Sequence, residues 1–502
     1  MLNGSYTGSM LEVSNTLGTN SEDITMGYYA ASAGMAIAYP IIPKVLAAVS
    51  VKFLLLTDLV LQFFLSWICA RSQNADILIV CSFAIGFLKG FLMLWFIRYA
   101  QKIFSPNNVR SEFYSYFYPL VYGGGQVSML VTAQLAYYYD WKYMYYFMML
   151  LMLVAILLVI ICFRHNRPIK SVPIADLHIR EMFIISAGLL MLMYVINYGK
   201  VLDWMSSAKI CAYIVIAPML IALFIWIQIH SDKPYVSLAP LYQPKAIIGY
   251  LYMMIVMFFS TSTTLLTNYL SVILKVDTTH TYSLYIYLLP GYLAGAFICF
   301  WWFCWQRWRF RFLIAGGMGC FVIFFAILYF GISPGSTYEM LYLPIFFRGL
   351  GMLTLIIAFA LFAVEDLNSK YLLSNAFFLI IFRSVLTPIM ATSFYSNVLY
   401  RLEQKYMCSL SETITTADPL AASKYSQSLN TALSQGHRYD EAVQIATNSL
   451  HATLQQQSLL LALKEILGYL LVISVIIAVV SRFIPFHKTI RVTFLRTGDD
   501  MV

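Results

Sequence analysis

Long apolar runs alternate with short polar and basic stretches along the whole chain. Each run holds about 20 mainly apolar residues, the length an α-helix needs to cross a bilayer. The runs are continuous rather than alternating, so they predict membrane-spanning helices and not the strands of an outer-membrane barrel. Thirteen runs begin near Met26, Val51, Ile77, Phe113, Tyr143, Met182, Lys209, Ala246, Tyr282, Phe312, Leu341, Tyr371 and Leu459.

Composition indicates the same class of protein. Hydrophobic residues make up 61% of the 502 residues and charged residues only 11%, with a mean hydropathy of +0.75. Soluble domains average about 25% charged residues. A chain this apolar would expose extensive apolar surface in water. We therefore predict an all-α polytopic membrane protein whose main partner is the lipid bilayer.

The basic residues predict how the chain is oriented. Nineteen Lys and Arg residues fall in the loops and tail on one side of the predicted spans, and five fall in the short loops on the other side. Cytoplasmic loops carry such an excess, so the C-terminus is predicted to be cytoplasmic. The same dispersed residues produce the net charge of +9 without forming a patch. Nucleic acid is therefore not expected as a partner.

Three stretches lack a continuous apolar run. Residues 164–180 are basic and contain two prolines, so they predict a cytoplasmic linker. Residues 400–457 predict an external loop, in which Asp440–Leu454 has helical spacing that runs directly into the last span. Residues 1–23 are polar. They are either a disordered tail or the polar end of a helix whose first half is missing.

Several short motifs occur in order along the chain. They are Phe104-Ser105-Pro106 with Asp140-Trp141-Lys142-Tyr143, Gly199-Lys200-Val201-Leu202-Asp203-Trp204-Met205-Ser206-Ser207, Lys233-Pro234 with Leu238, Arg348-Gly349-Leu350-Gly351, and Gln457 through Glu465. Together they resemble the major facilitator superfamily, specifically the EmrB/QacA-like drug:proton antiporters, which have two extra helices between two six-helix bundles.

The resemblance implies a division of the chain. When Leu17-Gly18 is aligned with the family's first helix, Met1 falls inside that helix, so the helix is expected to be truncated. The expected parts are an N-terminal bundle (1–163), a cytoplasmic linker (164–180), two extra helices (181–230), a C-terminal bundle with the external loop 400–457 (231–485) and a cytoplasmic tail (486–502).

The resemblance also implies a function. It is proton-coupled efflux of amphipathic small molecules or drugs across a bacterial inner membrane. The proton gradient supplies the energy and no cofactor is needed, while a periplasmic adaptor and an outer-membrane duct are the implied partners. The alternatives are a lipid or glycolipid flippase and a non-transporting assembly subunit. No metal-binding motif, nucleotide-binding loop or catalytic cluster occurs in the sequence, so an enzyme is not predicted.

The chain departs from the antiporter motif in one helix. Gly124, Ser128, Thr132 and Ala133 keep a stripe of small residues, but Met129 stands where the motif has proline. We expect the stripe to pack against a neighbouring helix and the proline kink to be absent.

Charges in or beside the apolar runs are the candidates for transport and coupling. At mid-bilayer a charge costs roughly 2.5 kcal/mol or more, so it usually faces a cavity or a partner. The candidates are Arg348, Asp58, Lys89, Arg383, Asp203 and Glu465. For Arg348 we predict a cavity or gating role, whereas Asp58 and Lys89 are equally compatible with structural pairs. Asp203 favours an N-cap of the next helix over a coupling role.

Aromatic and thiol groups complete the candidates. Tyr137, Tyr138, Tyr139, Tyr143, Tyr145 and Tyr146 predict an interfacial belt at the external membrane edge. The alternative is an aromatic cavity that binds lipophilic cations. Glu365 and Asp366 follow a predicted span and are expected to face water. Cys408 is the one cysteine in the stretch 400–457 and is expected to be exposed.

Overall fold

The computed structural model describes residues 10–105, 109–163, 178–303, 310–365, 367–413 and 418–484. Within these ranges the chain is helical and has no β-strand. Most of the predicted linker 164–180, the whole predicted tail 486–502 and Asp366 lie outside the described residues.

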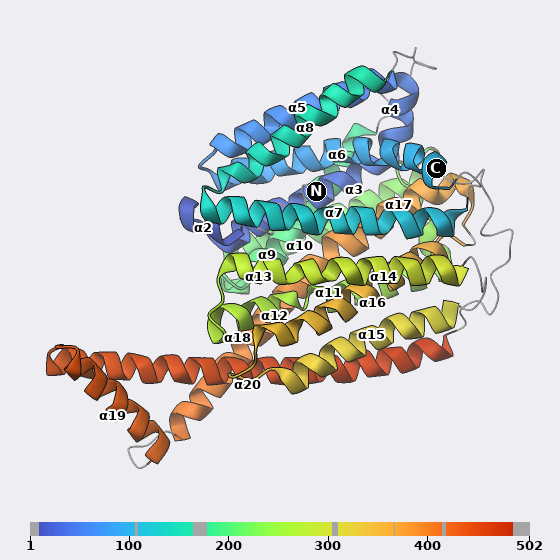
Figure 1. Ribbon diagram of the computed structural model, residues 1–502. Helices are drawn as coiled ribbons and strands as arrows, with labels where there is room; N and C mark the ends of the chain where they lie inside the picture. Colours follow the sequence, from blue (N-terminus) through green and yellow to red (C-terminus); the bar gives the residue numbers. More distant parts are fainter. Residues whose placement is uncertain are drawn as a thin grey trace.

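Twelve helical segments of the described chain are long and apolar enough to cross a membrane. Seven are single helices: α5 (Val51–Arg71), α6 (Ala75–Phe104), α8 (Lys142–Cys162), α9 (Ile179–Tyr198), α10 (Ala208–His230), α15 (Phe310–Gly331) and α20 (Tyr439–Phe483). Five consist of consecutive helical pieces: α3 (Ser21–Ala38) with η1 (Tyr39–Ile41) and α4 (Ile42–Ala48), α11 (Pro244–Thr261) with α12 (Thr263–Asn268) and η5 (Tyr269–Ile273), α13 (Thr278–Leu284) with η6 (Tyr285–Tyr287) and α14 (Leu288–Trp301), η8 (Tyr338–Leu341) with α16 (Tyr342–Phe362), and α17 (Leu372–Ile380) with η10 (Ile381–Leu386) and α18 (Thr387–Thr413). They run side by side, so the protein is an all-α polytopic membrane protein, as predicted (Figure 1).

The one remaining predicted run, which begins near Phe113, corresponds to helix α7, Arg110–Tyr138. It spans 29 residues and lies among the other long helices (Figure 1). It is not among the twelve apolar spans because it is rich in tyrosine, serine and glycine. The proline inside this helix is Pro119, well before the position where the antiporter motif has one.

The first predicted span begins earlier than the hydrophobic pattern suggested. Helix α3 starts at Ser21 rather than Met26, because the Asp23 carboxylate accepts a hydrogen bond from the Asn20 N–H at 3.2 Å and so caps the helix. A short helix, α2 (Met10–Leu17), precedes it. A disordered tail is therefore the wrong description of Met10–Leu17.

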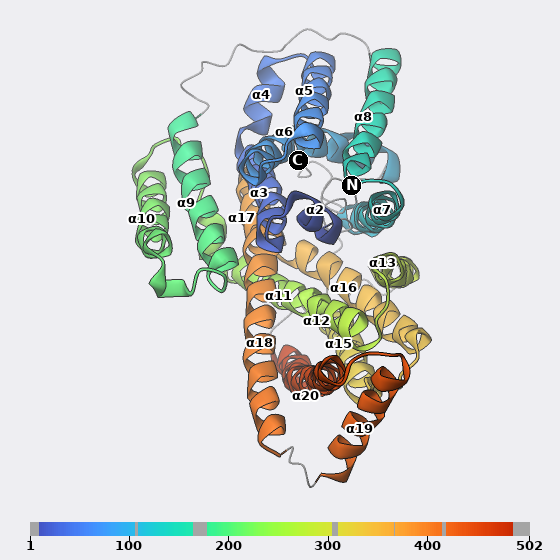
Figure 2. The same cartoon turned by 90° about the vertical axis from the view of Figure 1, so that its left-hand side faces the viewer.

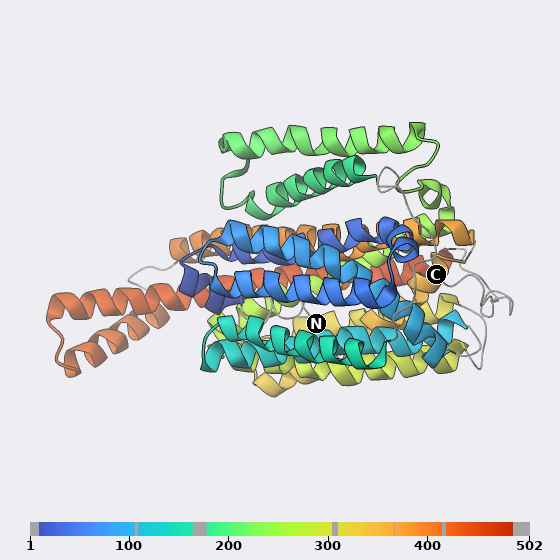
Figure 3. The same ribbon diagram turned by 90° about the horizontal axis from the view of Figure 1, so that it is seen from above.

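The long helices form two halves. Helices α3 and α5–α8 make the N-terminal half, and α11–α18 with α20 make the C-terminal half (Figures 1 and 2). Helices α9 and α10 pack against each other on the outer side, where α9 also contacts α3 and α18. This green pair stands apart from both halves in Figure 3. Its position suits the predicted pair of extra helices.

The stretch 400–457 is mostly helical, so its description as a loop was wrong. Helix α18 continues to Thr413, and α19 (Pro419–Ser434) turns back toward α20, which is one helix of 45 residues. This confirms that the helix over Asp440–Leu454 runs directly into the last span. The end of α18, α19 and the start of α20 form a helical extension that projects away from the bundle (Figures 1 and 3).

Glycines allow the helices around Arg348 to approach closely. A Cβ atom on Gly291 of α14 would lie 2.4 Å from the Phe346 carbonyl oxygen of α16, and one on Gly349 would lie 2.9 Å from the Leu288 carbonyl oxygen of α14. A Cβ atom on Gly351 would lie 2.8 Å from a carbonyl oxygen of α15. The two glycines of the Arg348-Gly349-Leu350-Gly351 motif thus place α16 against two neighbouring helices.

Candidate transport cavity

A cavity of about 1130 Å³ lies between the two halves of the bundle. Helices α3, α6 and α7 line it from the N-terminal half, and α11–α14, α16, η10 and α18 line it from the C-terminal half. Any relative movement of the two halves would therefore change its shape.

The cavity extends toward the end of the bundle from which the helical extension projects. Ser14 of α2, Glu22 of α3 and Ser271 line it there, and Ser271 is exposed. Toward the opposite end its lining includes Val364 and Leu372, which are both buried. The cavity is therefore open toward the side of the extension.

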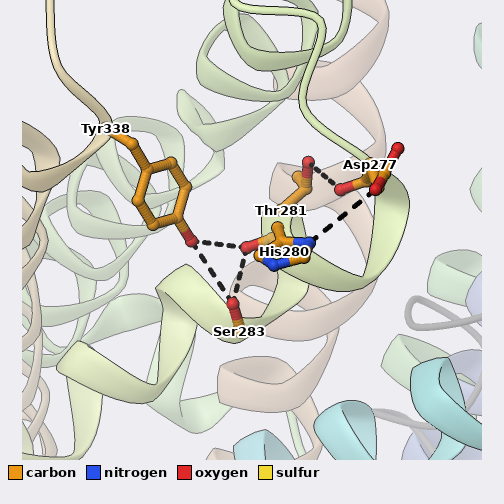
Figure 4. Close-up of polar contacts among 5 residues, drawn as sticks. All are labelled: Asp277, His280, Thr281, Ser283 and Tyr338. Atoms are coloured by element: carbon orange, nitrogen blue, oxygen red, sulfur yellow. Dashed lines mark hydrogen bonds and ion pairs between the residues drawn. The ribbon is translucent and has the colours of Figure 1, made fainter.

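A polar cluster lies at the open end (Figure 4). Thr281 lines the cavity and donates to the Asp277 carbonyl oxygen at 3.1 Å. The Tyr338 hydroxyl donates to the His280 carbonyl oxygen at 2.5 Å and lies 3.3 Å from the Ser283 hydroxyl. Because Tyr338 belongs to η8, these bonds fix the start of α13 to the segment that leads into α16.

Contacts of the segment between α10 and α11 help to close the opposite end. The Tyr235 hydroxyl, between α10 and α11, donates to the Ile37 carbonyl oxygen of α3. The Ser237 N–H donates to the Ser374 hydroxyl of α17 at 3.0 Å. Nearby, Lys245 and Glu365 form an ion pair at 3.2 Å in which the Glu365 side chain is only 7% exposed. The expectation that Glu365 faces water was therefore wrong, because the carboxylate turns inward to this lysine.

Arg348 lies deep in the cavity wall on α16. It is 7% exposed, and its Nη2 donates to the Ser260 carbonyl oxygen of α11 at 2.6 Å. Its Nε and Nη1 have no hydrogen-bond partner, and no carboxylate of the described chain forms an ion pair with it. Tyr285 and Tyr292 are close enough to interact electrostatically with the guanidinium group. Arg348 thus lies in the wall of the cavity, and its cavity or gating role stays a prediction.

Arg383 lines the cavity from the π-helical segment η10. Its Nε donates to the Ser384 hydroxyl at 3.3 Å, while Nη1 has no partner. Tyr118 and Tyr122 of α7 lie close to it across the cavity. A π-helical turn is a frequent feature of functional sites because it displaces one side chain from the regular helical pattern.

The lining is basic. Besides the two arginines it includes Lys89 of α6 and Lys200, whereas Glu22 at the open end is the only acidic residue among the described lining residues. Lys200 also lies 4.6 Å from the centre of the Tyr400 ring. Between the two predicted roles for Lys89, its position in the cavity favours contact with a substrate.

Tyrosines make up much of the remaining wall, and the sequence analysis missed them. They are Tyr28, Tyr29, Tyr39, Tyr114, Tyr118, Tyr122, Tyr282, Tyr285 and Tyr292. Tyr114, Tyr118 and Tyr122 repeat every four residues on α7, a spacing that aligns side chains on one helix face. This repeat is the sequence signal from which these three tyrosines could have been predicted. The Tyr122 and Tyr292 rings, one from each half, are 5.9 Å apart.

The predicted belt tyrosines divide into two groups. Tyr138 and Tyr139 are each 71% exposed, as an interfacial belt requires. Tyr145 is buried instead and packs edge-on against Trp141, so its assignment to the belt was wrong. Its position on α8 turns it toward the helices of the N-terminal half rather than toward lipid.

Asp58 and Glu465 lie away from the cavity. Asp58 of α5 is buried with Gln62 and Ser66 on one helix face, and neither of its oxygens meets the geometry of a hydrogen bond. Glu465 of α20 accepts hydrogen bonds from the Tyr406 hydroxyl at 2.6 Å and the Tyr469 hydroxyl at 3.0 Å. Neither carboxylate is therefore in contact with a substrate in the cavity.

Asp203 lies in the exposed turn between α9 and α10, also outside the cavity. Its side chain caps neither the short 3-10 helix that follows it nor α10, whose N-cap residue is Ser207. The N-cap prediction was wrong because Asp203 adopts the left-handed backbone conformation, with φ +50°, instead of the extended one that a capping residue uses.

The stripe of small residues on α7 has two surroundings. Ser128, Thr132 and Ala133 are buried, and the Ser128 hydroxyl contacts the Met148 sulfur of α8 at 4.0 Å. Gly124, one turn earlier, lines the cavity. Ser128 is thus in contact with a neighbouring helix, and the packing role of the whole stripe stays a prediction.

Two helical halves around a shared central cavity, with an arginine buried in its wall, define a secondary transporter. The family profile of the Major Facilitator Superfamily matches residues 1–385. The chain therefore belongs to the Major Facilitator Superfamily, and it is a multi-pass membrane transporter rather than an enzyme. No curated protein sequence matches it significantly.

The chain is similar to several solved transporter structures, and it shares the fold of the one with a TM-score above 0.5, a peptide transporter. The crystal structure of the peptide transporter POT in complex with alafosfalin is 15% identical with a TM-score of 0.52, covering 93% of both chains. The human organic anion transporter TETRAN is 13% identical with a TM-score of 0.44, covering 93% of this chain and 89% of that one. The nucleoside transporter NupG is 10% identical with a TM-score of 0.40, covering 96% and 95%. At such identities the likeness extends to the fold alone.

Proposed function

We propose that this transporter exports amphipathic small molecules by alternating access, with the proton gradient as its energy source. The observation that carries the proposal is the cavity of about 1130 Å³, which both halves of the bundle line and which opens toward one side. A rocking movement of the halves would open it to the other side by breaking the contact between Tyr235 and Ile37 described above. Its mixture of aromatic and charged groups suits molecules with an apolar body and a polar group.

The finer assignment rests on the helix pair α9–α10 and the ordered motifs. Both support the EmrB/QacA-like antiporters and a bacterial inner membrane location as our proposal, and the excess of basic residues on one side of the spans supports a cytoplasmic C-terminus. In that orientation the helical extension is external, where it would be available to a periplasmic adaptor and an outer-membrane duct.

The site geometry limits how proton coupling would work. Glu22 is the only acidic residue among the described residues of the cavity lining, and it lies at the open end. Asp58 and Glu465 are separated from the cavity. Coupling would therefore be indirect, with protonation changing the relative stability of two conformations rather than competing with substrate at one group.

Transport by the purified chain in liposomes tests the proposal. Two permanently charged probes share one ring system: naphthalene-2-sulfonate, an anion, and a trimethylnaphthylammonium, a cation. We expect at least one of them to accumulate under an imposed pH gradient and to stop accumulating when a proton ionophore is added. Accumulation of neither probe, in liposomes where the protein is folded and inserted, would contradict the proposal.

A blocking substitution provides the matched control. Thr264 of α12 lines the cavity and its hydroxyl donates to the Thr261 carbonyl oxygen, three residues earlier in the chain. Thr431 makes the same kind of bond on exposed α19, to the Gln427 carbonyl oxygen. Thr264→Trp should abolish transport by filling the cavity, while Thr431→Trp should leave it unchanged. Equal activity of the two variants would show that the substrate path lies elsewhere.

A further inference from the structure

We infer that the cavity selects organic anions. The acidic group, a carboxylate, sulfonate or phosphate, would bind the Arg348 guanidinium, and the apolar body would lie among the tyrosines. This inference rests on the proposed function and adds the chemical class of its substrate. It departs from the sequence-based alternative of a cavity for lipophilic cations.

The first argument is the unused bonding capacity of Arg348. The side chain is nine-tenths buried and lines the cavity, yet only Nη2 has a partner, the Ser260 carbonyl oxygen. A buried charge is unfavourable unless it is paired and hydrogen-bonded. A planar fork with free N–H donors matches the oxygens of a carboxylate, sulfonate or phosphate. The missing partner is therefore most simply an anion that arrives with the substrate.

The second argument is the charge balance of the whole lining. Lys89, Lys200, Arg348 and Arg383 face a single acidic residue, Glu22, among the described residues. Arg383 also has an unused donor, Nη1. A cation in the same space would meet four like charges and a single carboxylate, that of Glu22 at the open end, among the described residues. Cavity walls of low dielectric strengthen the repulsion.

The third argument is the arrangement of the aromatic rings. Tyr285 and Tyr292 lie beside Arg348, while Tyr118 and Tyr122 lie beside Arg383. The Tyr122 and Tyr292 rings approach to 5.9 Å across the two halves. An aromatic or aliphatic body would pack on these rings while its acidic group bonds to Arg348, and tyrosine hydroxyls would add further donors.

An amphipathic anion has two sources, a soluble organic acid and an acidic lipid. We favour the soluble acid, because the cavity opens at the end of the bundle and is lined there by polar residues such as Ser14, Ser271 and Thr278. A third probe, a short-chain phosphatidate, separates the two sources in the experiment.

Binding and counterflow with the purified full chain test the inference. We expect naphthalene-2-sulfonate to bind at least tenfold more tightly than trimethylnaphthylammonium, and more tightly than the phosphatidate. Arg348→Gln should weaken binding of the anion by about tenfold to a hundredfold, the range for a lost hydrogen bond to a charged group. Arg348→Lys should retain part of the affinity, because the charge stays and the fork is lost.

Arg311→Gln is the matched control. Arg311 also donates through Nη2 to a backbone carbonyl oxygen, that of Ile484 at 3.3 Å, but it lies outside the cavity. Its loss should leave binding of the anion unchanged. If Arg348→Gln does not fold, Arg383→Gln provides the second variant, with a smaller loss of affinity expected.

The outcomes separate the inference from the proposed function. If the cation is transported and the sulfonate is neither bound nor transported, the inference is wrong and the proposed export function stands; if only the phosphatidate is transported, both are wrong and the chain is a lipid flippase. Unchanged sulfonate affinity in folded Arg348→Gln, or in folded Arg383→Gln where the former is unstable, would also overturn it. If none of the three probes is transported, the proposed function itself fails.

Discussion

The close approach of α14 and α16 leads to a prediction for Gly291→Ala. The added Cβ would lie 2.4 Å from the Phe346 carbonyl oxygen and 3.0 Å from the Leu350 nitrogen, so the two helices would have to separate by about 1 Å to restore ordinary contact. Both obstacles are backbone atoms, which cannot rotate away. Overpacking of this kind costs about 1–3 kcal/mol. Because Arg348 lies between Phe346 and Leu350, the separation would also displace its guanidinium group from Ser260.

Gly319→Ala in α15 is the matched control. It adds the same methyl group to a neighbouring helix, and nothing lies within 4 Å of the new Cβ. Unfolding of both variants by sodium dodecyl sulfate in mixed micelles measures the difference in free energy. We expect Gly291→Ala to be less stable than Gly319→Ala by about 1–3 kcal/mol and to transport more slowly. Equal stability and equal transport would mean that α14 and α16 do not pack as described.

Three further predictions concern the ends of the bundle. A membrane-impermeant maleimide should label exposed Cys408 while the inner membrane is intact. It should label Cys162, which is exposed at the opposite end of the bundle, only after the membrane is broken. Labelling in the reverse order would show that the orientation is the opposite of the one proposed. Lys245→Met should destabilise the chain by about 3 kcal/mol because it removes the positive charge that pairs with buried Glu365, and adding Glu365→Gln should restore part of this stability; denaturation showing no recovery would refute the pairing. Burial raises the pKa of Glu12, so the folded chain holds this proton at a higher pH than the unfolded chain does. The free energy of unfolding, compared with that of Glu12→Gln, should therefore fall as the pH rises from the ordinary pKa of a glutamate to the raised pKa in the folded chain. Melting temperatures of the two proteins that change in parallel with pH would contradict this.

Much of the fold was predictable because lipid imposes a simple rule on the sequence. A backbone in hydrocarbon must satisfy its own hydrogen bonds, so a run of about 20 apolar residues is a helix. The predicted starts at Val51 and Lys209 accordingly fall within one residue of the structure. The rule weakened where a helix carries polar residues. Helix α7 has a polar face because it lines the cavity, and the helical extension lies outside the apolar runs altogether.

The site was predictable only in part, because burial of a charge does not reveal what the charge faces. Arg348, Lys89 and Asp58 all interrupt apolar runs and looked alike in the sequence. The structure places Arg348 and Lys89 in the cavity and Asp58 in the packing between helices. The difference depends on which helix face turns toward the other half of the bundle, and this is a property of the tertiary arrangement.

The charge of the cavity bears on how export would be powered. A univalent anion that leaves a cell with an inside-negative potential gains about 2.3 kcal/mol per 100 mV, which is roughly a 50-fold concentration ratio. A cation exported by the same route would have to be driven against that potential. An anionic cargo therefore relieves the proton gradient of part of the work. In the cavity, Arg348 and Arg383 face the substrate, and among the described residues no carboxylate is paired with either arginine. The proton gradient would then need only to bias the conformational cycle, which agrees with an anionic cargo.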